Sequence, residues 1–251
     1  MTSDPQLLEL QDTLYASRNP TRRWLHCTRR DWIIDTLHRY AADRFESAIE
    51  VGPGSGIYLP VLAELCDTVI AADIEMQYLE RAKELAAQYR NIQIAVDDIT
   101  ATALPMGAFD LVLCTEVIEH IADSAMAIAN MRKLLKPGGL LVLSTPQRYS
   151  PLEVAAKVAF LPGIIQVVRA IYRESIIETG HINLMTARQV QNQLRAAGFT
   201  LAEQHKSGLY LPLLAEFGGR LGLRTAQALE KNLRGSRLDW LLWTQYYVAK
   251  V

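Results

Sequence analysis

The sequence is poor in cysteine and has no long uninterrupted apolar run. Its 251 residues include three cysteines, and no two of them form a CxxC pair. A disulfide framework needs paired cysteines, and a structural zinc site needs clustered ligands. We therefore expect a reducing compartment, no disulfide and no metal site.

Net charge is also nearly absent. The chain carries 26 basic and 27 acidic residues, which leaves a formal net charge of −1. No overall field attracts nucleic acid or an anionic membrane, so either partner would need a local patch. Residues 1–11 include Asp4 and Glu9 and lack the apolar core of a signal peptide. These features place the protein in the cytoplasm.

Short apolar runs alternate with longer helical patterns along most of the chain. Strands are predicted at residues 48–51, 68–72, 92–96, 110–114, 140–144, 199–205 and 241–250. Helices are predicted between them, at residues 57–65, 76–89, 124–135 and 187–197. This alternation is typical of βαβ units, and near-continuous apolar strands suit a sheet covered on both faces. The sequence therefore predicts an α/β fold with a doubly wound, mostly parallel seven-stranded sheet. Its ligand crevice is expected beyond the carboxyl ends of the strands.

The strongest local signal is the glycine loop EVGPGSG at residues 50–56, between the first strand and the first helix. Glycines allow a tight turn and a close approach of the backbone to a ligand. A dinucleotide fingerprint needs its third glycine at the sixth position, and that position is Ile57 here, which opposes NAD. Asp73 ends the second strand, at the distance where a carboxylate meets ribose hydroxyls. Asp97 and Asp98 end the third strand, so acidic side chains mark three successive strand ends.

Five motifs occur in order at the expected spacing over residues 48–145. They are EVGPGSG, Asp73, DDIT followed by LP, FDLVLCTEVIEH and LKPGGLLVLSTP. Together they resemble a class I S-adenosylmethionine-dependent methyltransferase, and most of all the small-molecule enzymes that include quinone-biosynthesis methyltransferases. The resemblance implies the cofactor S-adenosyl-L-methionine and a single domain. Its parts would be an N-terminal helical cap (1–46), a cofactor-binding core (47–145), a helical insert or lid (146–184) and the last part of the sheet (185–251).

The resemblance also assigns roles to individual residues. The glycine loop would hold the cofactor, with Glu50 at its methionine end. Asp73 would bind the ribose, and Asp98 would face the adenine amine better than Asp97 does, although a turn or helix-cap role is the alternative for Asp73 and Asp98. The expected cofactor-binding residues are Glu50, Gly52, Gly54, Gly56, Asp73, Asp98, Thr115 and Glu116.

Methyl transfer is an in-line displacement at a sulfonium carbon, so the protein mainly aligns the reactants. A base is needed when the acceptor must lose a proton. His120, after the fourth strand, and His181, at the end of the insert, are the candidate bases. A histidine bonded to a carboxylate at a helix start and an ordinary loop histidine are the alternatives.

The acceptor is expected to be small and apolar or lipid-like, because residues 151–172 and 209–214 are rich in aliphatic side chains. Weak contact with a membrane surface is compatible with this pattern. Five N-terminal arginines could meet an anionic acceptor or form a solvated helix face: Arg18, Arg22, Arg23, Arg29 and Arg30. A protein methyltransferase and a cofactor-binding regulatory protein without turnover are the alternative functions. A nucleic-acid acceptor is disfavoured because no basic domain is present. The oligomeric state does not follow from the sequence.

Overall fold

The computed structural model describes residues 14–41, 44–159 and 180–251. Predictions for the first thirteen residues and for residues 160–179, the middle of the expected insert, lie outside the described residues.

Seven strands form one sheet in the order β3-β2-β1-β4-β5-β7-β6. The strands are β1 Phe45–Val51, β2 Cys66–Asp73, β3 Ile92–Val96, β4 Phe109–Thr115, β5 Leu135–Pro146, β6 Thr200–Ser207 and β7 Thr244–Lys250. The first five strands are parallel, and β7 pairs antiparallel with both β5 and β6. The order reverses between β1 and β4, which confirms the predicted doubly wound sheet, and a ligand crevice is expected at the carboxyl ends of these strands.

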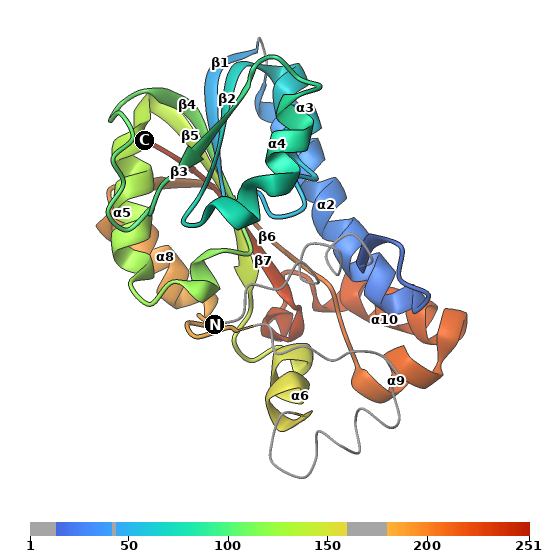
Figure 1. The fold of residues 1–251 in the computed structure, drawn as a ribbon. Helices are drawn as coiled ribbons and strands as arrows, with labels where there is room; N and C mark the ends of the chain where they lie inside the picture. Colours follow the sequence, from blue (N-terminus) through green and yellow to red (C-terminus); the bar gives the residue numbers. More distant parts are fainter. Residues whose placement is uncertain (1–13, 42–43, 160–179) are drawn as a thin grey trace.

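Helices cover both faces of this sheet (Figure 1). They are α2 Pro20–Tyr40, α3 Leu59–Leu65, α4 Glu80–Ala86, α5 Ser124–Leu134, α6 Pro151–Ala159, α8 Ala187–Ala196, α9 Pro212–Phe217 and α10 Gly219–Leu233. One apolar core joins α2, α3 and α4 to one face, and a second joins α5 and α8 to the other. Neighbouring strand residues serve opposite cores: Leu111 and Leu113 face the first, whereas Val112 and Cys114 face the second. Strands buried on both sides explain the near-continuous apolar runs in the sequence.

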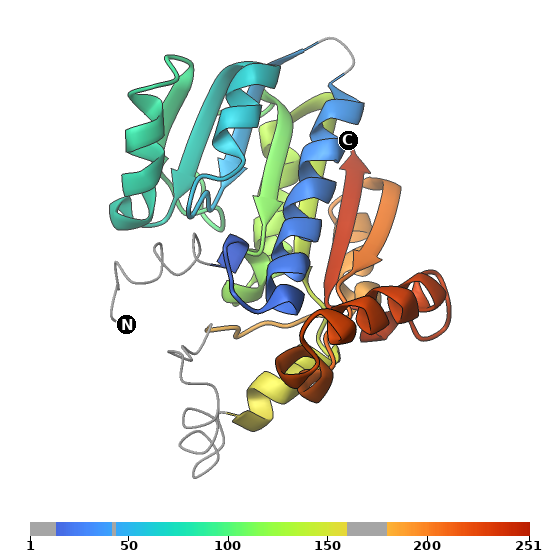
Figure 2. The same cartoon turned by 90° about the vertical axis from the view of Figure 1, so that its right-hand side faces the viewer.

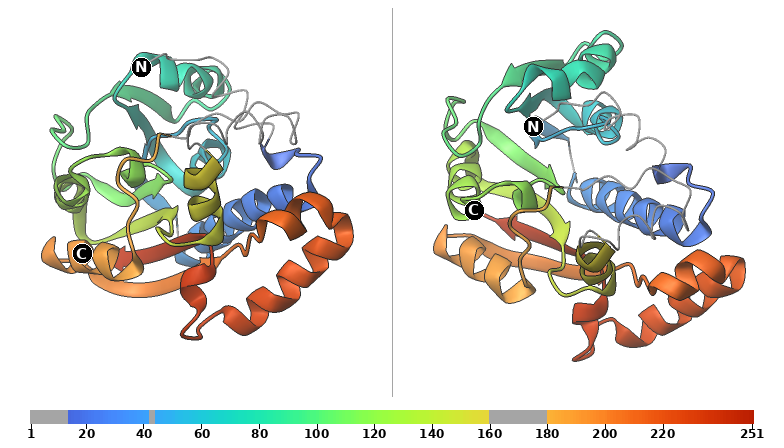
Figure 3. Two further views of the ribbon diagram at one scale, coloured as in Figure 1. Left: turned by 90° about the horizontal axis from the view of Figure 1, so that it is seen from below. Right: turned by 60° about the horizontal axis from the view of Figure 1, so that its bottom comes forward.

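The main departure from the predicted order lies between the last two strands. The β6–β7 connection contains the helices α9 and α10, which pack against each other and against α2. Figures 2 and 3 show α6, α9 and α10 at the end of the molecule to which the carboxyl ends of the parallel strands point. A second, smaller difference is that the predicted helix at 76–89 is a short 3-10 turn, Met76–Leu79, followed by α4.

Candidate functional site

The glycine loop lies where the strand order reverses. Gly52, Gly54 and Gly56 all have positive φ angles, of 70°, 52° and 69°, which glycine adopts without the steric cost of a Cβ. The Gly52 N–H donates to the Ala72 carbonyl oxygen at 2.8 Å, which ties the loop to the end of β2. A Cβ added at Gly52 would lie 2.4 Å from Cγ2 of Val117. The loop and the segment after β4 therefore approach as closely as their atoms allow.

Glu50 is a buried carboxylate near the end of β1. Neither of its oxygens has a hydrogen-bond partner within the described part of the chain. Burial raises the pKa of Glu50 to about 8, because loss of water disfavours the charged form. Buried acceptors without donors are rare in folded proteins. Glu50 therefore fits a ligand that supplies an ammonium or N–H group.

Asp73 is the last residue of β2, and Asp98 lies two residues beyond the end of the neighbouring β3, but the two differ in what they already bind. Oδ1 of Asp73 accepts the Ile74 N–H at 2.7 Å, and burial raises the pKa of Asp73 to about 6 despite this bond. Oδ1 of Asp98 accepts both the N–H and the hydroxyl of Thr100, at 2.8 and 2.7 Å. This pair of bonds stabilises the turn after β3 and uses one carboxylate oxygen, so the turn role of Asp98 is compatible with ligand binding at the other oxygen.

Glu116 follows Thr115, the last residue of β4, in a left-handed conformation with φ of 56°. Such a conformation is uncommon for a residue other than glycine and persists only where its surroundings impose it. Its Oε2 accepts from Nη1 of Arg29 at 2.7 Å, and its Oε1 accepts from the Ser144 hydroxyl at 2.8 Å. Glu116 therefore already has a cationic partner supplied by α2.

Arg29 is not part of a solvated helix face, which was one of the two expectations for the N-terminal arginines. Its side chain is buried, and its guanidinium lies 5.3 Å from the centroid of the Trp243 ring. A signal for this exists in the sequence, because Arg29 lies four residues after Leu25 and four before Ile33. These positions share one face of a helix, and all three are buried against the rest of the molecule.

His120 and His181 are brought together by the loop after residue 179. The carbonyl oxygen of Glu119 accepts the N–H groups of Ile182 and Asn183, at 3.0 and 2.9 Å. The two imidazole rings are 5.1 Å apart between centroids. Nδ1 of His120 lies 3.3 Å from the Gly180 carbonyl oxygen. Burial, followed by the nearby His181, lowers the pKa of His120.

Two buried carboxyl groups lie close to these histidines. Nδ1 of His181 lies 3.1 Å from Oε2 of Glu153, and the Trp243 indole N–H donates to the other oxygen of Glu153 at 2.9 Å. Glu119 is fully buried, and its Oε1 has no partner in the described residues. Burial raises the pKa of Glu119 well above its ordinary range. Ligand atoms of Glu119, His120 and His181 lie within 4.8 Å of one another, a grouping that the sequence spacing did not indicate.

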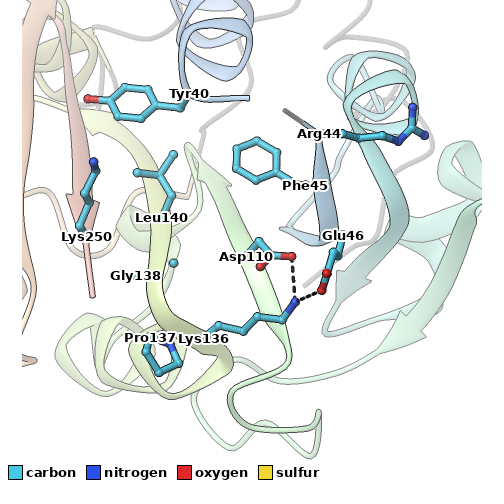
Figure 4. Close-up of a pocket in the computed structure, with 11 residues that line it drawn as sticks. Tyr40, Arg44, Phe45, Glu46, Asp110, Lys136, Pro137, Gly138, Leu140 and Lys250 are labelled. Carbon is cyan, nitrogen blue, oxygen red and sulfur yellow. Dashed lines mark hydrogen bonds and ion pairs between the residues drawn. The ribbon is translucent and has the colours of Figure 1, made fainter. Parts of the chain in front are cut away.

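A hollow of about 470 Å³ lies at the opposite end of the sheet (Figure 4). Its lining includes Lys136, whose Nζ contacts Glu46 and Asp110 at 2.7 and 3.0 Å. None of the predicted site residues lines this hollow. Because it is at the amino ends of β1 and β4, it is separate from the crevice expected for a ligand.

A family model described as a methyltransferase domain matches residues 24–204. A Mycolicibacterium smegmatis protein named "Probable S-adenosylmethionine-dependent methyltransferase" is 27% identical over 188 residues, which cover 73% of this chain and 63% of that protein. A ubiquinone biosynthesis O-methyltransferase of Cereibacter sphaeroides is 38% identical over 102 residues, 40% of this chain and 41% of that enzyme. The chain thus spans less than two thirds of the length of these relatives.

Solved structures share the fold at low sequence identity. An S-adenosylmethionine-dependent methyltransferase from Aquifex aeolicus has a TM-score of 0.60 at 13% identity, with both chains covered in full. The N-methyltransferase NodS from Bradyrhizobium japonicum, solved with S-adenosyl-L-homocysteine, has a TM-score of 0.57 at 18% identity and covers 97% of both chains. These similarities confirm the predicted Rossmann-like architecture.

Proposed function

Since this chain belongs to the methyltransferase-domain family matched over residues 24–204, as its sequence motifs predicted, we propose that it transfers the methyl group of S-adenosyl-L-methionine to a small, apolar or lipid-like acceptor. Bound at the crevice, that cofactor supplies a methyl carbon already activated by its sulfonium. The chain's own task is then to bind, to align and, for some acceptors, to remove a proton.

The observation that carries the proposal is the buried carboxylate of Glu50, the first residue of the glycine loop, whose oxygens have no partner in the described residues. A charge in this position is costly unless a cation or donor pairs with it. The ammonium of the methionine moiety has the required charge. Asp73 would accept from the ribose hydroxyls, and Gly52, Gly54 and Gly56 would hold the loop backbone in the left-handed conformations with which it borders the cofactor.

Two other predicted contact residues, Asp98 and Glu116, already have partners within the chain. Asp98 has one oxygen committed to Thr100, so we assign the adenine amine to its second oxygen. Thr115 and Glu116 would border the methionine portion. Because Glu116 is paired with Arg29, we expect the pair to shape the pocket rather than to supply a free charge.

The histidine pair is the proposed acceptor side of the site. An acceptor hydroxyl that meets His120 or His181 could pass its proton to the unprotonated ring. The lowered pKa of His120 favours its neutral, base-competent form near neutral pH. The carboxylate of Glu153 would hold His181 in one tautomer and stabilise its charge after proton uptake.

Calorimetry with S-adenosyl-L-methionine and with NAD tests the cofactor assignment. We expect heat of binding with the first and none with the second. Binding of NAD alone would overturn the proposal.

Radiolabelled cofactor incubated with a lipid extract and with a protein extract tests the acceptor class. Label in the lipid fraction supports a lipid-like acceptor, and label in protein supports the protein methyltransferase alternative. Cofactor binding without any label would favour a regulatory protein without turnover.

Each assay should be repeated with a chelator, because the group of Glu119, His120 and His181 has the composition of a transition-metal site.

Substitution of the two histidines tests the proton-transfer role. His120→Ala and His181→Ala should each slow turnover by about 10²–10⁴-fold, the usual contribution of a general base, while cofactor affinity stays unchanged. His38→Ala, at an exposed position of α2, is the matched control. Unchanged turnover in both variants would remove the histidines from the mechanism while leaving cofactor binding intact.

A further inference from the structure

The β6–β7 connection directs its acidic side chains inward. Oε1 of Glu216 accepts from Nε of Arg22 at 3.1 Å, which joins α9 to α2. Oε2 of Glu230 accepts the N–H groups of Gly208 and Leu209, at 2.9 and 3.1 Å. Asp239 pairs with Lys206 of β6 at 2.7 Å. Every carboxylate between residues 208 and 243, all of which the structure describes, is therefore used to fasten the connection to the rest of the molecule.

The exposed charges of the same connection are all positive. Within residues 208–243 the exposed charged side chains are Arg220, Arg224, Lys231, Arg234 and Arg237, and no Asp or Glu there is exposed. Arg234 forms an ion pair with Glu230. None of the ion pairs in the described part of the chain involves Arg220, Arg224 or Lys231. Because the whole chain has a net charge of −1, this is a local positive surface rather than a consequence of composition.

Large apolar side chains accompany these cations. Leu213, Phe217 and Leu221 are 78%, 70% and 75% exposed, and they flank Arg220. Further along the connection, the exposed apolar residues are Leu229, Leu238 and Trp240. Single exposed apolar residues need no explanation, but larger apolar patches are typical of interaction sites, and six such residues lie within this one connection.

Helix α6 extends the same combination. It lies beside α9, and its exposed side chains include Val154, Lys157 and Val158, while its only acid, Glu153, is buried. Figure 3 shows α6, α9 and α10 at one end of the molecule. We use the name basic-apolar surface for the exposed side chains of α6 and of residues 213–240.

We propose that the basic-apolar surface docks the protein on an anionic lipid bilayer. Leucine, phenylalanine and tryptophan side chains would enter the headgroup region, and arginine and lysine would meet lipid phosphates. Within the described residues, no helix has the length and apolarity to cross a bilayer, so the contact would be interfacial. Docking of this kind goes beyond methyl transfer and does not depend on it.

The charges favour a bilayer over other occupants. A symmetric dimer through this surface would place the cations of one copy against those of the other. A nucleic acid would pair with the arginines but would leave Leu213, Phe217 and Leu221 without an apolar partner. A bilayer satisfies both kinds of side chain at once.

Vesicle sedimentation of the full chain tests the proposal. We expect binding to vesicles that contain about one third phosphatidylglycerol, weak or no binding to pure phosphatidylcholine, and loss of binding between about 0.1 and 0.5 M salt. Arg220→Glu/Arg224→Glu should lower the partition coefficient at least about tenfold. Arg90→Glu/Arg188→Glu, at exposed positions of other elements, makes the same change in net charge and should bind like the parent chain.

A second pair of variants separates apolar insertion from charge. Leu213→Ser/Phe217→Ser should also weaken binding, whereas Met106→Ser, at a 69% exposed position away from the surface, should not. Circular dichroism melts establish that each variant is folded. Equal binding to neutral vesicles, equal loss in the Arg90/Arg188 control, or no binding by the parent chain would overturn the proposal. So would formation of a dimer that Leu213→Ser/Phe217→Ser abolishes, in the absence of vesicle binding.

Discussion

Glu50→Gln should make the protein more stable at alkaline pH. In the folded chain burial raises the pKa of Glu50 to about 8, against an ordinary value of 4.5. A raised acid pKa means that the folded state holds the proton more tightly than the unfolded state does. The stability from this proton is therefore complete below pH 4.5 and is lost as the pH rises to about 8. At about 1.4 kcal/mol per pH unit, the loss amounts to roughly 5 kcal/mol at most.

Glutamine has nearly the same shape and no charge, so the variant should escape this loss. Urea unfolding at several pH values measures the free energy of unfolding of both proteins. We expect the two proteins to have similar free energies of unfolding near pH 5, and the variant to be several kcal/mol more stable near pH 8. Glu46→Gln is the matched control, because Glu46 is on the same strand with its side chain 81% exposed.

Cofactor binding should reverse this advantage. If an ammonium pairs with Glu50, saturating S-adenosyl-L-methionine should stabilise the parent chain more at pH 8 than at pH 6, and the variant should bind it more weakly at both. Calorimetry in buffers of different ionisation enthalpy would record release of a proton near pH 7. If the free energies of unfolding of parent and variant changed with pH in parallel, the reasoning would be refuted. That result would mean that Glu50 has the same pKa in the folded and the unfolded chain.

Two further perturbations address the strand tips and the contact with α2. Asp73→Asn should weaken cofactor binding by roughly 10- to 100-fold, the effect of losing charge-assisted hydrogen bonds to a diol. The cofactor affinity of the parent chain should fall as the pH drops through about 6, where Asp73 takes up a proton. Calorimetry measures both effects, with Asp67→Asn at an exposed position as the control. Arg29→Met should cost about 3–5 kcal/mol of unfolding free energy, because it leaves the Glu116 carboxylate without its cation. Arg29→Met combined with Glu116→Gln should recover part of that loss in urea unfolding.

The sequence was sufficient to predict the sheet and the edge of it at which the acidic side chains gather. Parallel strands bring their carboxyl ends to one edge whatever their side chains do, so Glu50, Asp73 and Asp98 could be placed near one another from strand boundaries alone. What each carboxylate binds could not be predicted. Asp98 and Asp73 both lie at or just beyond the ends of strands, yet only the folded loop shows that Asp98 accepts hydrogen bonds from Thr100.

The elements that escaped prediction depend on long-range packing. Only Gly218 separates α9 from α10, and α9 begins at a proline and has six residues, too few to show a long apolar period in the sequence. An added Cβ at Gly222 would lie 2.3 Å from the carbonyl oxygen of Leu214, which means that small residues let the two helices meet. Such a contact has no signature in local spacing, because it joins two separate helices.

The sequence and the structure give different reasons for a glycine at position 52. In the sequence its lack of a side chain suggests room for a ligand. In the structure the space that a Cβ would need is already occupied by Val117. We therefore expect Gly52→Ala to destabilise the protein before any ligand is added. The cost should combine about 1–2 kcal/mol for the left-handed backbone with about 1–3 kcal/mol for the overlap with Val117.

Gly107→Ala separates these two contributions. Gly107 has a similar φ of 64°, and a Cβ there would meet no atom within 4 Å, so urea unfolding of this variant measures the backbone cost alone. The excess cost of Gly52→Ala should shrink when Val117→Ala is added, as a double-mutant cycle would detect. If Gly52→Ala cost no more than Gly107→Ala, the loop would yield to the added methyl group. The close approach of the two segments would then be no constraint on the loop, and the glycine would have to be explained by the ligand alone.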